Sequence, residues 1–247
     1  MALFALTLAS YLCYNTWYLF VPVIASIHRN SKSIGKKCVV LKSVLFSLTI
    51  LAILFLASYK ISSNSFNFIK LNYTSIIQFK KITPNLGIWW YFFTEIFAFF
   101  NDFYLMVFNL YSFIFIIPLT IKFADDAAFT IWMCIGFIIF SKQYPVIADL
   151  TLFYSLLIIF KKYFSKLKFS PIVSYMSLFM ILLLLPIFYR VWMISNSGNA
   201  NFFYAIGLVL SLIEIIIMSD FIWSKIQVDW YLENNVDLKN NVKLTQM

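Results

Sequence analysis

The chain has 247 residues, of which 62% are hydrophobic and only 12% are charged, and its mean hydropathy is +0.87. This composition lies far outside the range of soluble domains and indicates an integral membrane protein. The formal net charge of +9 comes from short basic blocks beside apolar runs, which indicates membrane topology signals and excludes a nucleic-acid-binding domain.

Runs of about 20 apolar residues, the length that crosses a bilayer, define the candidate spans. We predict an all-α, polytopic transmembrane bundle of about seven spans, or about five if residues 127–160 form a re-entrant hairpin. The candidate spans are 3–27, 39–59, 103–122, 127–140, 144–160, 171–192 and 203–223. Residues 224–247 are polar without strong periodicity, and we predict a largely unstructured cytosolic tail.

Basic residues in short loops predict the orientation. The segments HRNSKSIGKK (28–37) and KKYFSKLK (161–168) are the densest in Lys and Arg, and we place both in the cytosol. The 60–87 loop then faces the lumen, although its own lysines argue against this. It contains NYT at Asn72 to Thr74, a candidate N-glycosylation site. With seven crossings, Met1 falls on the lumenal side without a cleavable signal pattern, so we expect further sequence upstream.

The chain shows no spacing typical of a metal site, and we predict no metal and no cofactor. Cys13, Cys38 and Cys134 are odd in number, far apart, and inside or beside apolar segments. They are expected to be small buried hydrophobic residues rather than disulfide partners. The lone His28 lies in a basic loop and is expected to be solvated.

The stretch PNLGIWWYFFTEIFAFFNDF (84–103) surrounds two carboxylates with aromatic residues. Ionisable groups at membrane depth are costly, which makes Glu95 and Asp102 candidate functional residues. The alternative is that they only bond neighbouring helices. Read as one helix, residues 91–109 would place one polar stripe along a face otherwise rich in Phe, Ile, Leu and Met. That stripe comprises Tyr91, Thr94, Glu95, Ala98, Asp102 and Asn109.

A single helix over 88–121 would be roughly 50 Å long, whereas the hydrocarbon core is about 30 Å thick. We therefore predict an interfacial helix near 88–100, followed by a span that bends near Asn101 and Asp102. Trp89, Trp90 and Tyr91 are residues typical of the headgroup level.

Three further carboxylates lie in or beside apolar runs: Asp149, Glu214 and Asp220. Single polar residues often join helices within membrane bundles, and we interpret Glu214 and Asp220 in this way.

A second polar concentration, SNSGNANFFYAIG (195–207), lies at the predicted lumenal junction of the last two spans. Gly198 permits a tight turn, and Asn199 and Asn201 carry amide donors and acceptors where headgroups begin. Phe202 starts an aromatic belt on the following span. The alternative interpretation is a helix-capping turn, because Asn and Ser are common caps.

Five motifs occur in an order and with gaps similar to those of the PIG-U family, the multi-spanning subunit of the glycosylphosphatidylinositol (GPI) transamidase of the endoplasmic reticulum. They are PNLGIWWYFFTEIF (84–97), IPLTIK (117–122), YPVIADLTLF (144–153), GNANFFYAI (198–206) and SDF (219–221). A fainter likeness begins at LASYLCYNTWYLFVPVI (8–24). The chain resembles the C-terminal portion of that family.

The resemblance implies a non-catalytic subunit that helps assemble the complex and recognises or presents the GPI lipid, while a separate cysteine-protease-like subunit performs the transamidation. Its implied partners are that subunit, other transamidase subunits, the GPI lipid and the membrane, with no nucleic acid. It also implies a fold related to glycosyltransferases of the C type. The family's lumenal Asn pair near the GPI site falls on Asn199 and Asn201, and the acid of its aromatic motif falls on Glu95.

Two other functions are open. A lipid-linked-sugar glycosyltransferase would need an acidic motif on an early lumenal loop, which we would expect upstream of this sequence. The adjacent pair Asp125 and Asp126 falls on the predicted cytosolic side. A transporter would normally show internal repeats and paired interrupted helices, and we find no convincing repeat.

Overall fold

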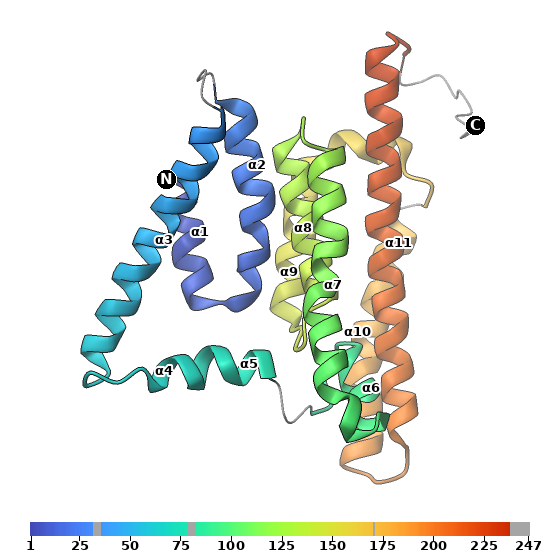
Figure 1. Cartoon of the computed structure of the whole chain (residues 1–247). Helices are drawn as coiled ribbons and strands as arrows, with labels where there is room; N and C mark the ends of the chain where they lie inside the picture. Colours follow the sequence, from blue (N-terminus) through green and yellow to red (C-terminus); the bar gives the residue numbers. More distant parts are fainter. Residues whose placement is uncertain (32–35, 79–82, 170, 238–247) are drawn as a thin grey trace. The chain divides into compact units, whose positions relative to one another are not determined.

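The computed structural model describes residues 1–31, 36–78, 83–169 and 171–237, and all regular elements in these ranges are helices (Figure 1). Within these described ranges, four helical segments are long and apolar enough to cross a membrane: Cys38–Ile61, Ala98–Lys122, Pro171–Met193 and Ala200–Glu233. The predicted class, an all-α membrane helix bundle, is confirmed. The predicted spans 3–27 and 144–160 do not form single helices, because two helices divide the first run and the α-helix in the second run ends at Leu156. The crossing predicted at 127–140, the C-type glycosyltransferase likeness and the sidedness stay predictions.

The chain divides into two compact units. The first comprises Met1–Pro84 and Phe92–Lys142, and the second comprises Asn85–Tyr91 and Gln143–Met247. The short segment Asn85–Tyr91 therefore packs with elements far along the chain.

The apolar run 3–27 in the first unit forms two helices rather than one. Helix α1 (Ala2–Leu12) ends at Cys13, whose backbone is extended, and a 3₁₀ turn, η1 (Tyr14–Leu19), leads into α2 (Phe20–Asn30). The Trp17 indole donates to the Ser10 carbonyl at 2.9 Å, which fixes the turn. Figure 1 shows the chain reversing direction between α1 and α2. Apolar content alone does not reveal this break.

The core of the first unit forms where α2, α7 (Asn101–Lys122) and α8 (Ala127–Phe140) pack together, while α1 and α2 also pack against α3 (Lys36–Ile61). Ile116, Phe129 and Met133 are fully buried there. Cys134 is buried as predicted, whereas Cys13 and Cys38 are exposed. The Tyr18 hydroxyl donates to the Asn109 carbonyl at 2.6 Å and joins η1 to α7.

The helix predicted over 88–100 is shorter than expected. Helix α6 covers Trp89–Glu95, the chain is extended at Phe97, and a 3₁₀ turn, η3 (Ala98–Phe100), precedes α7. Phe92 lies against Tyr104 and Phe108, with ring centroids 5.0 and 5.3 Å away, so the chain folds back on α7. The predicted bend therefore occurs before Asn101, because aromatic packing favours a reversal at Phe97.

The second unit contains α9 (Ile147–Leu156), a 3₁₀ helix η4 (Leu157–Lys166), α10 (Pro171–Met193) and α11 (Ala200–Glu233). Helices α10 and α11 form an extensively packed pair. The prediction that residue 224 begins an unstructured tail is wrong, because α11 continues to Glu233. Ser224, Val228 and Tyr231 are buried at helical spacing, and this packing stabilises the extension.

Carboxylates in the second unit satisfy backbone donors. Asp220, which is only 8% exposed, accepts from the backbone N–H groups of Lys168 and Phe169 at 2.8 and 3.0 Å. Asp149 accepts from the Val146 N–H at 2.9 Å at the start of α9. The prediction that Asp220 bonds within the bundle is confirmed. Glu214 is buried, and the structure gives it no hydrogen bond to another described residue.

Replacing Asp220 with Ala should destabilise the protein by about 2–4 kcal/mol, because two backbone donors lose their acceptor in a buried position. Asp220→Asn retains one acceptor oxygen and should give an intermediate loss. Thermal unfolding in detergent, followed by size-exclusion fluorescence, measures the change. Asp149→Ala, which removes one half-exposed acceptor, is the control and should cost about 1 kcal/mol. An unchanged midpoint for Asp220→Ala would contradict this role.

Candidate lipid-binding site

The segment Asn85–Tyr91 packs tightly against the rest of the second unit. The Asn85 side chain accepts from the Gly87 N–H at 2.7 Å, which closes a turn. A Cβ atom added at Gly87 would lie 2.8 Å from the Pro145 Cδ atom, so any larger residue would require Pro145 to move. On α11, a Cβ added at Gly207 would lie 3.6 Å from the Leu86 carbonyl, an ordinary van der Waals contact. The close approach therefore requires glycine at Gly87 but not at Gly207.

Trp90 is the centre of an aromatic cluster that joins this segment to α10 and α11. Its side chain is 3% exposed. The ring stacks on Trp192 with centroids 5.8 Å apart, and it packs edge-on against Tyr204 at 5.6 Å. Phe203 lies 5.9 Å away and also contacts Trp192. Aromatic pairs in these geometries add stabilisation beyond the area they bury.

Two tyrosines connect the cluster to the polar turn. The Tyr91 and Tyr204 rings stack with centroids 4.5 Å apart. The Tyr91 hydroxyl donates to the Asn201 side-chain oxygen, and the Tyr204 hydroxyl donates to the Ile88 carbonyl at 3.2 Å. Predicted site residues Tyr91 and Asn201 are therefore brought together.

The turn before α11 is a helix cap. Asn199 is the N-cap residue, and its side-chain oxygen accepts from the N–H groups of Asn201 and Phe202 at 3.0 and 3.4 Å. Asn196 adopts a positive φ of 51°, a conformation that Asn tolerates better than most residues. The capping alternative for Asn199 is confirmed. Asn199 is an exposed residue, and its side-chain nitrogen donates to none of the described residues.

Trp89 and Trp90 are both buried within the second unit, at 2% and 3% exposure, and aromatic rings of α10 and α11 pack against Trp90. Their placement at the headgroup level stays a prediction. Phe202 is 58% exposed and lies next to Phe188, with ring centroids 6.4 Å apart. Phe202 is thus the member of the predicted aromatic set that presents an apolar surface beside the Asn turn.

Glu95 and Asp102 are exposed residues of the first unit. The continuous polar stripe predicted for residues 91–109 is wrong, because the helix breaks between Glu95 and Asn101. Since Asn199 and Asn201 belong to the second unit, a single site that combines these acids with the two amides stays a prediction.

Asn72 is exposed on a π-helical turn, η2 (Lys70–Thr74), between the short helices α4 (Asn67–Ile69) and α5 (Ser75–Gln78). It lines an open cleft of about 390 Å³ with Tyr11 and Tyr14. The Tyr73 hydroxyl donates to the Tyr11 carbonyl, and burial, with a smaller effect of Tyr11, raises the pKa of Tyr73. Asn72 is therefore accessible, and its glycosylation stays a prediction.

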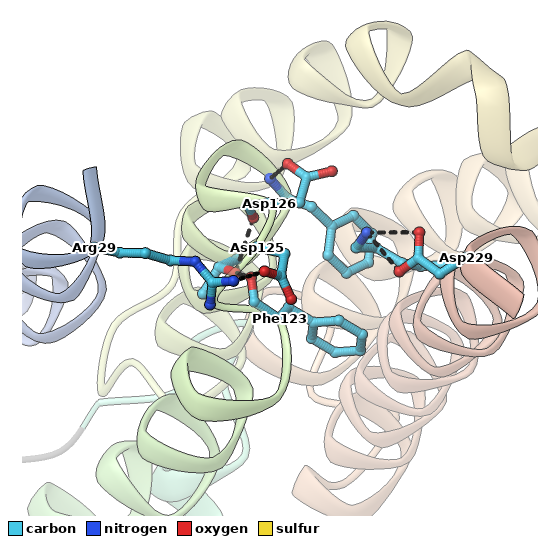
Figure 2. A network of polar contacts seen from close by, with 8 residues as sticks. Arg29, Phe123, Asp125, Asp126 and Asp229 are labelled. Atoms are coloured by element: carbon cyan, nitrogen blue, oxygen red, sulfur yellow. Dashed lines mark hydrogen bonds and ion pairs between the residues drawn. The ribbon is translucent and has the colours of Figure 1, made fainter. Parts of the chain in front are cut away.

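The adjacent acids Asp125 and Asp126 have structural contacts (Figure 2). The Asp125 carboxylate pairs with the Arg29 guanidinium, so α2 and the α7–α8 turn meet at one end of the first unit. Asp126 caps α8 by accepting from the Phe129 N–H at 3.1 Å. Among the described residues, no cluster of three or more His, Cys, Asp or Glu side chains could hold a metal ion.

Sequence reasoning missed Trp192 and Tyr204 as parts of the site. Both lie beside the 195–201 turn, where aromatic residues are dense on either side. That density is the available signal. Their contact with Trp90 is not predictable from it, because the partners lie on segments far apart in the chain.

Comparison with known proteins matches this chain to one family. A family model described as GPI transamidase subunit PIG-U matches residues 1–210. The chain belongs to the PIG-U family. Its match contains the Asn85–Tyr91 segment, the Asn199 cap and the Trp90 cluster.

Curated relatives of this PIG-U family member include the GPI transamidase component GAB1 of Saccharomyces cerevisiae, 40% identical over 189 residues, which are 76% of this chain and 48% of the relative. The GAB1 homolog of Schizosaccharomyces pombe is 38% identical over 181 residues, 71% of this chain and 44% of the relative. The human GPI-anchor transamidase component PIGU is 31% identical over 175 residues, 71% of this chain and 40% of the relative. The chain spans about half the length of these relatives, or less.

Replacing Trp90 with Ala should cost about 3–5 kcal/mol of stability, because it leaves a large cavity among three aromatic rings. The matched control is Phe202→Ala, a change on the exposed side of the same turn, which should cost less than about 1 kcal/mol. Thermal midpoints in the same detergent compare the two variants. Equal midpoints would contradict the central packing role of Trp90.

Proposed function

We propose that this chain is a non-catalytic membrane subunit of the GPI transamidase complex, which helps assemble the complex and presents the GPI lipid. The observation that carries the proposal is the PIG-U match over residues 1–210, together with relatives named as GPI transamidase components. The four long apolar helices agree with a membrane subunit. We place it in the endoplasmic reticulum membrane with its C-terminus in the cytosol.

The acidic pair Asp125 and Asp126 has a structural role in this proposal. Asp125 pairs with Arg29, and Asp126 caps α8, so both carboxylates are engaged in structural contacts. We assign the transamidation chemistry to a separate cysteine-protease-like subunit. That subunit and the other transamidase components are the proposed partners.

For the lipid, we propose that the turn before α11 contacts the phosphate-bearing region of GPI. Asn199 and Asn201 are exposed, and each uses its side-chain oxygen within the protein. Their amide N–H groups are suited to anionic oxygen, and the helix N-terminus adds a favourable dipole. Phe202 offers an adjacent apolar surface to acyl chains.

The remaining predicted site residues have either a structural role or a role in contacting the glycan. Trp89, Trp90 and Tyr91 hold the turn in place from within the protein. Glu95 and Asp102, both exposed, would face the glycan, whose hydroxyl groups can donate to carboxylates.

An Asn199→Asp variant separates lipid contact from helix capping. Asp is as good an N-cap as Asn, so stability and complex assembly should be retained. The variant replaces amide donors with a negative charge, and losing one hydrogen bond to a charged group costs about 1.5–3 kcal/mol. We therefore expect GPI attachment to a reporter protein to fall by about tenfold or more, measured by its cell-surface level in cells that carry only the variant.

Two controls accompany this variant. Asn199→Ser keeps a capping hydroxyl without the charge and should retain most attachment. Asn64→Asp introduces the same charge at an exposed Asn in the first unit, whose positive φ of 59° Asp also tolerates, and should leave attachment normal. Normal attachment with Asn199→Asp at equal expression would refute the lipid contact.

A further inference from the structure

The 3₁₀ helix η4 (Leu157–Lys166) has a feature that the transamidase role does not use. It is kinked at Phe160, whose φ of −99° and ψ of 24° are not helical, so it consists of two short helical turns. Leu157, Phe160 and Tyr163 are buried, and each is at most 4% exposed. Ile158 and Ile159 are exposed before the kink, and Lys161 and Lys162 are exposed after it. The segment is therefore amphipathic, with its exposed apolar residues before the kink and its exposed basic residues after it.

Contacts with α11 hold the buried face of η4 in place. The Ser224 hydroxyl donates to the Tyr163 carbonyl at 2.5 Å. The Lys166 ammonium lies 4.3 Å from the centroid of the Tyr231 ring. Lys225, which is 4% exposed, lies 5.5 Å from the centroid of the Tyr163 ring. These contacts fix which residues of η4 point outward.

The end of this region that follows η4 is also anchored to α11. Within α11, the buried Lys225 ammonium pairs with the Asp229 carboxylate at 2.8 Å, and Figure 2 shows the Asp229 side chain in this contact. After η4, the Asp220 carboxylate holds the backbone N–H groups of Lys168 and Phe169. Lys168 and Phe169 are exposed and add another basic and apolar pair. Figure 1 shows the chain turning at the end of α9 to run across toward α11.

The length of α11 places this region at a membrane surface. Its 34 residues would extend about 51 Å, well beyond a hydrocarbon core of about 30 Å. Residues 203–223 suffice to cross that core, so the contacts of η4 with Ser224 and Tyr231 lie at the end that projects from it. A segment held at this level has its exposed residues among lipid headgroups.

We propose that residues 157–169 form an in-plane anchor that binds anionic phospholipid headgroups through Lys161, Lys162 and Lys168, with Ile158 and Ile159 inserted at the acyl boundary. The positive charge complements an anionic leaflet, and each basic residue near such a surface contributes about 1 kcal/mol. Exposed isoleucines beside lysines are the arrangement by which amphipathic segments lie in the interface. An acidic polypeptide is the other occupant that the charge would allow, and the experiment distinguishes it.

The test uses the full chain in nanodiscs that contain phosphatidylcholine and phosphatidylserine in equal amounts. Native mass spectrometry then measures the ratio of the two lipids retained on the protein. The chain should retain phosphatidylserine preferentially, and Lys161→Gln with Lys162→Gln should lower that preference by about fivefold or more. This readout does not depend on transamidase activity.

The charge-matched control is Lys60→Gln with Lys70→Gln, two exposed lysines of the first unit. This variant should keep the lipid preference of the unmodified chain. The proposal is overturned if Lys161→Gln with Lys162→Gln retains the preference, or if the control loses it equally. It is also overturned if the unmodified chain shows no preference for phosphatidylserine but retains an added poly-glutamate peptide. All variants change exposed side chains, and size-exclusion chromatography checks that they remain folded.

Discussion

The need to satisfy backbone N–H groups within a very apolar chain determines where its few acidic and amide side chains lie. An unpaired backbone donor costs several kcal/mol in an apolar environment. Asp126 and Asn199 provide acceptors at the starts of α8 and α11, and Asp220 satisfies two donors just before α10. These polar groups therefore have structural roles, and only their remaining polar atoms can contact a ligand. Such atoms, for example the side-chain nitrogen of Asn199, define the candidate site.

Local patterns in the sequence predicted the helical class and the bonding of Asp220 within the chain, and they gave the cap at Asn199 as an alternative. They failed where long-range packing decides the structure. Tryptophan is typical of the headgroup level of a membrane, yet the rings of Trp192 and Tyr204 pack against Trp90 within the protein. The extension of α11 to Glu233 depends on burial of Val228 and Tyr231. The many polar residues of this segment make the helical spacing of its buried residues hard to recognise in the sequence. The sequence alone does not show whether the side chains of a tryptophan pair contact lipid or other residues of the protein.

The two exposed polar regions of the second unit suggest a division of roles along α11. At its N-terminus, amide groups and an exposed Phe202 are suited to the phosphate and acyl parts of a lipid. Near its other end, η4 presents lysines and isoleucines to a membrane surface. In this account the packed aromatic cluster and the capped helix ends supply a rigid support, and the exposed residues supply the contacts.

The central claim, that this chain acts within the GPI transamidase, is tested most directly by affinity purification of the tagged chain from endoplasmic reticulum membranes in mild detergent. Mass spectrometry identifies the accompanying proteins. The account predicts recovery of the cysteine-protease-like subunit together with other transamidase components. Recovery of the folded chain without any of them would contradict it.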